Sequence, residues 1–487
     1  MTIPGPPHAE DLEEPLLVAG SAGRHEERED DDRGERGLLT GSTAVNTNFS
    51  PCVLNLTKAI FGAGMMALPR AVTLLGAYLG FGMLGAVGAI TWLSISRGLV
   101  YPAARLISAE HPGAQGHSAV LHDGYSGLVN SYLGYTSRQV LNFFLLANSI
   151  GFSVMYVTVI GDVLLGDLEH PGMVVELLKW LDLPEALQAA LLHRPTFIAL
   201  LMVTAIAPVS LRRSMASLSS LNAIGLCALC GLFGAMTWLL VAAVSSGAAH
   251  ALPAWPDLDG LAEMSTGSPV LAALSLLAVV LTADGCHLNV MPLAGMMEPA
   301  FSPRGLDSIT GTALSLVTFF YIAFSGAAYM VFGEDLQADV LQNLSPAAMR
   351  PLIGHGNAIA VAYSVRIAYA VSLLGNTALN NFPLRAALFD VLFAGDDAVC
   401  DKHFVVVTLG VLALVYVLSV SVTSVWKVVG MVGGLTSTGV CYLFPALLIF
   451  AYSRSVRVDS TRAWLRAVGG MLFAMGSGIF INTLGHF

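Results

Sequence analysis

Long apolar stretches, separated by short polar connections, occupy most of the chain. A helix needs about 20 predominantly apolar residues to cross the hydrocarbon core of a membrane. Segments of this kind are expected at 53–76, 79–101, 138–166, 194–211, 217–245, 268–296, 307–332, 354–379, 403–425, 427–452 and 463–485. The pattern predicts an all-α integral membrane protein with about eleven transmembrane helices.

Two of these spans are interrupted near the middle. The first contains Gly62-Ala63-Gly64 and then Pro69, and the sixth contains a polar run from Asp284 to Asn289 followed by Pro292. A helix can unwind inside a membrane only where its backbone lines a cavity or meets a ligand. Interrupted spans five apart indicate an inverted five-plus-five repeat with a mid-membrane binding site. We therefore predict a secondary active transporter that works by alternating access.

The break in span 1 suits a ligand that carries both a carboxylate and an ammonium. The N–H groups of Ala63, Gly64 and Met65 begin the second half-helix, where the positive helix end favours a carboxylate. The carbonyl groups freed before the break would hold an ammonium. Gly62 and Gly64 let a ligand approach the backbone closely, although glycines also serve to pack helices in membranes.

The composition supports a membrane protein and gives no sign of an enzyme. Hydrophobic residues make up 55% of the 487 residues and charged residues only 11%, which excludes an ordinary soluble domain. No Gly-rich phosphate loop, metal cluster or nucleophile triad stands out, so we predict no catalytic site, no metal site and no cofactor. Much of the net charge of −10 comes from the N-terminal tail, and it does not indicate a nucleic-acid partner.

Residues 1–50 differ from the transmembrane domain predicted at 51–487. They are rich in Pro, Gly, Glu, Asp and Arg, which predicts a disordered acidic tail. Lys and Arg gather in the connections on the same side as this tail, so we place the N-terminus in the cytoplasm. The pairs Leu16-Leu17 and Leu38-Leu39 look like dileucine sorting signals, which would bind sorting adaptors, or are chance pairs in a biased segment.

Four motifs in order give the chain a resemblance to a known family. They are Gly62 and Gly64 followed by Leu68-Pro69; Pro208 to Leu218; Cys286-His287 with Val290 and Pro292; and Val365-Arg366 followed by Phe382 to Arg385. The chain resembles the amino acid/auxin permease superfamily, and is similar to plant and fungal vacuolar amino acid transporters and to sodium-coupled neutral amino acid transporters. The resemblance implies a LeuT-like core, an amino acid substrate, and a binding site near Cys286 and His287.

Lys58 departs from part of this family. In the sodium-coupled transporters the corresponding position is an Asn assigned to sodium binding, so a fixed ammonium could replace the ion here. A buried lysine can also release and regain a proton. We therefore favour proton-coupled symport or antiport at a vacuole or other endomembrane. The alternatives are a Lys58 that reaches the membrane interface, a sodium-coupled plasma-membrane transporter, and an amino acid sensor that signals through its tail.

Four further side chains are site candidates with open roles. Asp284, where the family usually has an uncharged residue, could pair with Lys58, bind the substrate, carry the coupled proton, or only balance Lys58 or Arg366. His287 can change charge near neutral pH or be a neutral core residue. The resemblance implies a cation-site hydroxyl in span 8, for which Ser372 and Thr377 are candidates, unless they bond their own helix.

Overall fold

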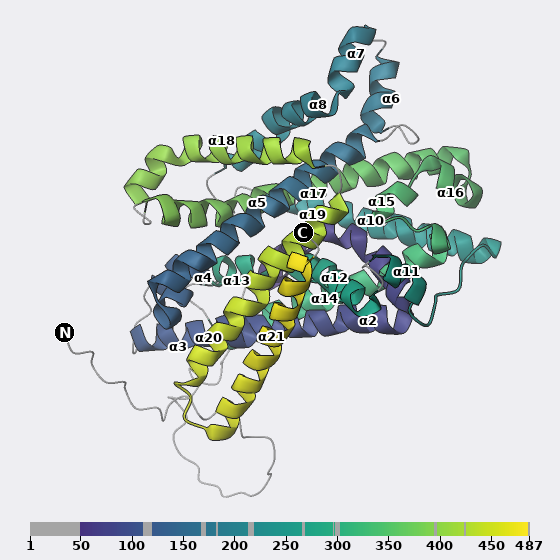
Figure 1. Cartoon of the computed structure of the whole chain (residues 1–487). Coiled ribbons are helices and arrows are strands. Elements are labelled where there is room, and N and C mark those ends of the chain that lie inside the picture. The colour runs from purple at the N-terminus through teal and green to yellow at the C-terminus, as the bar shows by residue number, and fades with distance from the viewer. Residues whose placement is uncertain are drawn as a thin grey trace, which may run out of the picture.

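The computed structural model describes residues 49–110, 119–166, 172–181, 184–212, 219–264, 268–295, 297, 302–393, 397–422 and 425–485. Except for Phe49 and Ser50, the predicted tail with its two leucine pairs lies outside these residues. The regular elements of the described residues are helices (Figure 1). The prediction of an all-α protein is confirmed.

The helices of the membrane domain follow the apolar pattern. The longer ones are α2 (Leu68–Ile95), α5 (Tyr135–Leu165), α10 (Ser219–Ser246), α12 (Pro269–Asp284), α14 (Pro303–Phe332), α17 (His355–Phe393), α18 (Asp397–Ser421) and α21 (Asp459–Gly485). The shorter ones are α1 (Phe49–Ile60), η4 (Ala63–Ala67), η5 (Ser96–Val100), α3 (Tyr101–Glu110), α4 (Ala119–Leu133), α6 (Met173–Trp180), α7 (Glu185–Leu192), α8 (Arg194–Leu201), η6 (Met202–Ile206), α9 (Ala207–Ser210), α11 (Leu258–Met264), α13 (His287–Gly295), η8 (Gly333–Asp335), α15 (Val340–Asn343), α16 (Pro346–Ile353), α19 (Val425–Met431), η9 (Val432–Ser437), η10 (Gly439–Leu443) and α20 (Phe444–Ser453).

Nine helical segments of the described residues are long and apolar enough to cross a membrane. A tenth is formed if Glu185–Leu192 and Arg194–Ser210, bent by 73°, count as one span. The chain is therefore a multi-pass membrane protein. Two spans of the predicted eleven are missing from the nine, because the first two predicted spans share one continuous segment, Gly64–Ile107, and the fourth is the bent pair.

That segment turns at Gly76, where the sequence predicts the end of span 1. Gly76 has φ +70°, and an added Cβ would lie 2.5 Å from the backbone of Trp255. A left-handed backbone this close to another chain segment requires glycine. The following Ala77 N–H donates to the Pro253 carbonyl at 2.7 Å, which anchors the turn to the connection before α11.

Two long helices, α5 and α17, form the most extensively packed pair of the described residues, and α10 also packs along α17. Arg138 on α5 holds Asp390 on α17 with two hydrogen bonds, one of them from Nε at 2.9 Å, so the pair is also tied by charge. On the other side of the site, α14 packs against α1 and α2. The binding region therefore lies between a firmly joined helix pair and the two interrupted spans.

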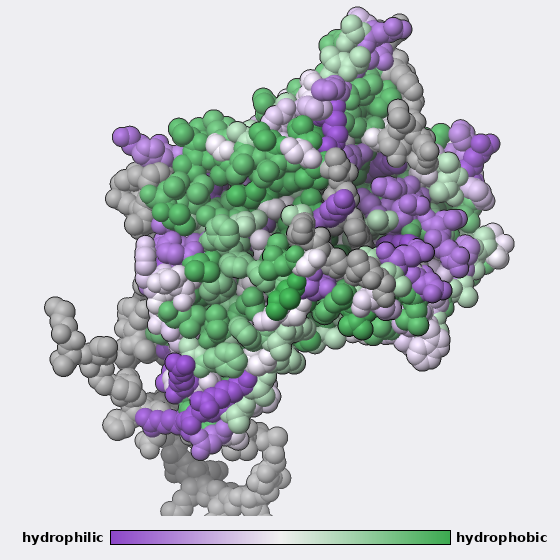
Figure 2. All heavy atoms as spheres, in the orientation of Figure 1, coloured by the Kyte–Doolittle hydropathy of each residue, from purple (hydrophilic) through white to green (hydrophobic). Residues whose placement is uncertain are grey.

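Apolar side chains gather on the outer surface of the spans. Figure 2 shows a broad hydrophobic surface over α5, α17 and α18, with hydrophilic residues gathered around the connection between α20 and α21 and around α15 and α16. Burying apolar side chains against lipid instead of water is the arrangement expected of a protein that spans a bilayer. The two hydrophilic regions belong to connections that the sequence places on opposite sides of the membrane.

Candidate functional site

The helix of span 1 is interrupted where the sequence predicts it. Helix α1 ends at Ile60, residues 61 and 62 form a bend, and the 3-10 turn η4 leads into α2. Side chains from other helices bind the freed carbonyl oxygens. Tyr321 Oη donates to Ile60 at 3.2 Å, Asn376 Nδ2 to Phe61 at 2.6 Å, and Tyr369 Oη to Gly62 at 3.2 Å. The Ile60 and Phe61 carbonyl oxygens each keep a second lone pair for a ligand.

Some N–H groups of the break already donate a hydrogen bond within the protein, and others do not. The Met65 N–H donates to the Gly62 carbonyl at 3.4 Å, within the turn itself. The N–H groups of Gly62 and Gly64 donate to no acceptor in the part of the chain that the structure describes. These two donors can therefore bind a carboxylate without first losing a bond inside the protein.

Span 6 is interrupted beside span 1. Helix α12 ends at Asp284, Gly285 is extended with ψ 92°, and α13 begins at His287. The two breaks touch, because a Cβ on Gly64 would lie 3.1 Å from the Cα of Ala283. Tyr321 joins them, since its hydroxyl lies 3.0 Å from the Ala283 carbonyl oxygen and 3.2 Å from that of Ile60, and its one proton is shared between these two acceptors.

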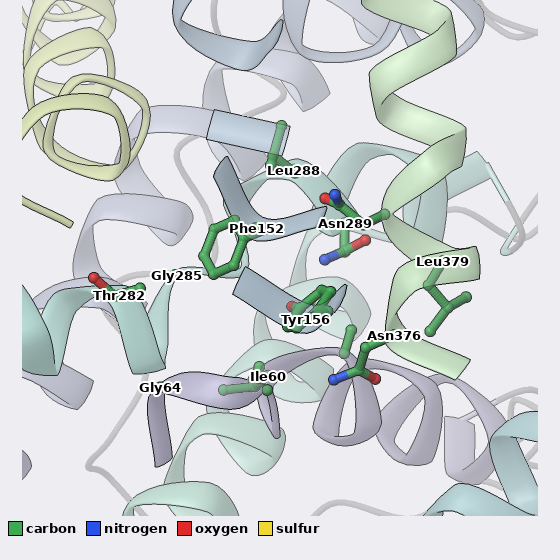
Figure 3. A pocket seen from close by; sticks show the side chains of 13 residues that line it. Ile60, Gly64, Phe152, Tyr156, Thr282, Gly285, Leu288, Asn289, Asn376 and Leu379 are labelled. Atoms are coloured by element: carbon green, nitrogen blue, oxygen red, sulfur yellow. The ribbon is translucent and has the colours of Figure 1, made fainter. Parts of the chain in front are cut away.

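A cavity lies between the two breaks, α5 and α17. Its wall includes Gly62 and Gly64 from span 1, and Gly285 and Asn289 from span 6. The other two helices contribute Phe152, Tyr156, Asn376, Leu379 and Asn380. Figure 3 shows the side chains of Asn289 and Asn376 extending into the space on either side of Tyr156. The cavity thus combines backbone, aromatic and carboxamide groups.

Lys58 points into the protein rather than to the membrane interface. The residue is 1% exposed, and its Nζ donates to the carbonyl of Ser372 at 3.0 Å and to Oδ1 of Asn376 at 2.5 Å. Gly225 on α10 leaves room for the chain, since a Cβ there would lie 2.6 Å from the Lys58 Cε. The Lys58 ammonium therefore joins α1 to α17 just before the break. Asn376, which accepts from Lys58, also donates to the Phe61 carbonyl at the break itself.

The two hydroxyl candidates of span 8 lie in different settings. Ser372 meets Lys58 through its carbonyl, while its own buried Oγ has no partner among the described residues. Thr377 Oγ1 donates to the Leu373 carbonyl of its own helix at 2.9 Å. Of the two, only Ser372 lies at the Lys58 contact.

The polar residues of span 6 that the sequence singles out lie behind the cavity wall. Asp284 is 1% exposed, and within the described residues neither of its carboxyl oxygens has a hydrogen-bond partner. His287 Nε2 lies 3.0 Å from Ser94 Oγ, which itself donates to the Cys441 carbonyl at 2.6 Å. Because that serine has one proton to give, His287 must donate from Nε2. Cys286 is fully buried.

Sequence reasoning missed several residues that form the site. Asn289 ends the polar run of span 6 without a predicted role, and Asn380 directly follows the predicted span 8, in which only Ser372 and Thr377 are candidates. Tyr156, Tyr321 and Tyr369 meet the breaks from other helices, and nothing in their local sequence marks them. Only long-range packing brings these hydroxyl groups to the unwound backbone.

The connection between α14 and α17 packs against η4, the segment that follows the break in span 1. Within it, helix α15 packs against η4, and three side chains of the connection, Leu336, Val340 and Leu341, are buried. Arg70 Nη1 also donates to the Leu336 carbonyl at 3.3 Å. With the predicted orientation, this connection faces away from the cytoplasm.

Acid should stabilise this connection through Asp339. Asp339 keeps part of its surface exposed, yet burial of its carboxyl group raises its pKa from 3.8 to about 6; Asp162 adds to the rise, while the Leu341 N–H and Arg366 oppose it. A raised pKa means that the packed connection binds the proton more readily, so its stabilisation is complete below about pH 4 and is lost as the pH rises through about 6.

Amide hydrogen exchange of residues 336–344, corrected for intrinsic rates, should therefore be slower at pH 5 than at pH 7.5. Asp339→Asn, which mimics the neutral acid, should remove this difference. Asp335→Asn, at an exposed position of the same connection, should leave it in place. Equal protection of the native chain at both pH values would contradict the prediction.

The chain is similar in sequence to known membrane transporters. Residues 46–484 match the family model described as transmembrane amino acid transporter protein. The chain is 25% identical over 440 residues to the amino acid transporter AVT6E of Arabidopsis thaliana, covering 89% of this chain and 82% of that protein. It is 24% identical over 476 residues to the vacuolar amino acid transporter 6 of Saccharomyces cerevisiae, covering 89% of this chain and 97% of that protein.

Among solved structures, the chain is similar to MhsT in complex with L-phenylalanine. The TM-score is 0.48 and the sequence identity 14%, over 91% of this chain and 99% of that one. The family match by sequence covers both interrupted spans and every residue of the cavity. Membership of a transporter family also confirms that the chain is not an enzyme. The chain belongs to the transmembrane amino acid transporter protein family.

Proposed function

We propose that this protein moves amino acids across a vacuolar or other intracellular membrane by alternating access, coupled to protons. The cavity at the two interrupted spans is the observation that carries the proposal. The relatives whose names place them in amino acid transport and, for the yeast protein, at the vacuole support the substrate and the membrane. Transport of amino acids as such follows from the family.

The main-chain groups of the substrate are held by the break in span 1. Its carboxylate binds the N–H groups of Gly62 and Gly64, which have no acceptor among the described residues. Its ammonium binds the remaining lone pairs of the Ile60 and Phe61 carbonyls. Hydrogen bonds to charged groups contribute about 1.5–3 kcal/mol each, so the backbone alone gives substantial affinity for any amino acid.

Lys58 takes the place of a coupling ion. Its ammonium bonds the Ser372 carbonyl and the Asn376 carboxamide, which are oxygen ligands of the kind that a hard cation prefers. A covalently attached cation holds α1 against α17 without sodium. The transporter can then run on another ion gradient.

Asp284 is the residue that carries the coupled proton. An ionised carboxylate buried without a donor is strongly disfavoured, and both Asp284 oxygens lack a partner among the described residues. The neutral, protonated acid fits this conformation. Because Asp284 ends α12 at the break, movement of the two halves of span 6 exposes it to water, where it releases the proton.

Uptake into proteoliposomes tests the proposal. The full chain is reconstituted, and a labelled amino acid mixture is offered under an imposed pH gradient or, separately, a sodium gradient. Accumulation driven by the pH gradient without sodium is expected. A strict requirement for sodium would overturn the proton coupling, and binding without flux under either gradient would favour a sensor.

A further inference from the structure

The cavity wall carries no charged side chain among the described residues that form it. Lys58 and Asp284 lie behind that wall and are not part of it. A substrate side chain that enters the cavity therefore meets carboxamide, aromatic and aliphatic groups. A charged side chain would lose its hydration here without gaining a partner of opposite charge, which is costly.

Some polar groups of the wall are already occupied. Asn376 uses Oδ1 to accept from Lys58 and Nδ2 to donate to the Phe61 carbonyl. The Thr282 hydroxyl bonds the carbonyls of Ala278 and Val429. These groups hold the protein together and are not free to recognise a substrate side chain.

Two carboxamides remain available. Asn380 Nδ2 donates to the Ser149 carbonyl at 2.7 Å and to Ser153 Oγ at 3.0 Å, which leaves its Oδ1 as an acceptor. The carboxamide of Asn289 has no hydrogen-bond partner among the described residues, and Asn289 lines the cavity across from Asn376 (Figure 3). It offers both a donor and an acceptor.

The position of these groups assigns them to the substrate side chain. Gly62 and Gly64 hold the main-chain groups at the break, whereas Asn289 on α13 and Asn380 on α17 line the cavity from other helices. Leu288 and Leu379 lie beside them and provide an aliphatic wall for methylene groups. The free groups of these two carboxamides are the NH2 of Asn289 and the Oδ1 atoms of Asn289 and Asn380, all of them neutral.

We propose that Asn289 and Asn380 form a side-chain subsite that selects amino acids with a neutral, hydrogen-bonding side chain, a carboxamide or a hydroxyl. This inference rests on the proposed function and names the substrate class of the same site. A carboxamide satisfies both asparagines, because its NH2 donates to Asn380 Oδ1 and its carbonyl accepts from Asn289. An apolar side chain of equal length leaves buried polar groups unpaired, which costs about tenfold or more in affinity.

Competition against uptake of labelled alanine by the reconstituted full chain tests the subsite. Glutamine and serine should compete at concentrations at least about tenfold lower than glutamate, lysine or norleucine. Competition by lysine or norleucine at the same concentrations as glutamine would overturn the inference while leaving amino acid transport intact. Absence of uptake of every labelled amino acid, glutamine included, would instead count against the proposed function.

A charge introduced at Asn289 gives the second test. Asn289→Asp places an acid against the substrate side chain, so the ratio of lysine to glutamine transport should rise at least about tenfold. Asn357→Asp is the matched control, because Asn357 is exposed at the start of α17, and its ratio should equal that of the native chain. An unchanged ratio in folded Asn289→Asp, as judged by size-exclusion chromatography, would remove Asn289 from substrate selection.

Discussion

Replacement of Lys58 by methionine should reduce proton-driven uptake by at least about tenfold. Methionine has a similar length but no donor, so Asn376 Oδ1 loses its partner, and the Ser372 carbonyl, which lies within helix α17, loses its second donor. The unsatisfied buried Oδ1 costs about 1–3 kcal/mol, and about 1.4 kcal/mol corresponds to a factor of ten. The loss falls on the conformation in which α1 is held against α17. Initial uptake rates in proteoliposomes measure it.

Lys58→Asn should separate the role of the charge from that of the lysine. If Lys58 stands in for a cation, an asparagine leaves room for sodium beside the Ser372 carbonyl, and sodium should restore part of the lost uptake. Lys427→Met is the control, because Lys427 is exposed and should be indifferent to replacement. Full proton-driven uptake by Lys58→Met would remove Lys58 from the coupling mechanism.

The sequence predicted the spans and their interruptions because both are local features. Hydrophobic runs mark membrane segments wherever they occur, and Gly62, Gly64 and Gly285 weaken a helix at the place where they stand. The burial of Lys58 was also predictable from its position one turn before Gly62. The inverted repeat stays a prediction, since it rests on the relation between the two breaks alone.

The sequence could not identify which residues of span 6 face the cavity. A continuous helix carries its facing side along at 3.6 residues per turn, but the extended Gly285 separates α12 from α13 and ends that periodicity. Asp284 and His287 are the chemically conspicuous residues, yet Gly285 and Asn289 line the wall. Side chains that reach the breaks from distant helices, such as Tyr321, depend on packing that no local pattern records.

Asp284→Asn should abolish accumulation of substrate against its gradient while preserving exchange. Asparagine has nearly the shape of the protonated acid, so the conformation that buries Asp284 without a partner remains accessible. It cannot release a proton, however, and the pH gradient can no longer be linked to movement of the two halves of span 6. Concentrative uptake should fall to the equilibrium level, and exchange of internal for external amino acid should continue and lose its pH dependence.

Concentrative uptake and exchange should be measured side by side in three variants. Asp259→Asn, at an exposed position of α11, should behave as the native chain in both assays. Lys58→Met should lose uptake and exchange together, because it weakens the helix contact on which both depend. Asp284→Asn alone should separate the two activities. Continued proton-driven accumulation by Asp284→Asn would show that the proton is carried by another group, and a loss of exchange along with accumulation would give Asp284 a role in the conformational change itself.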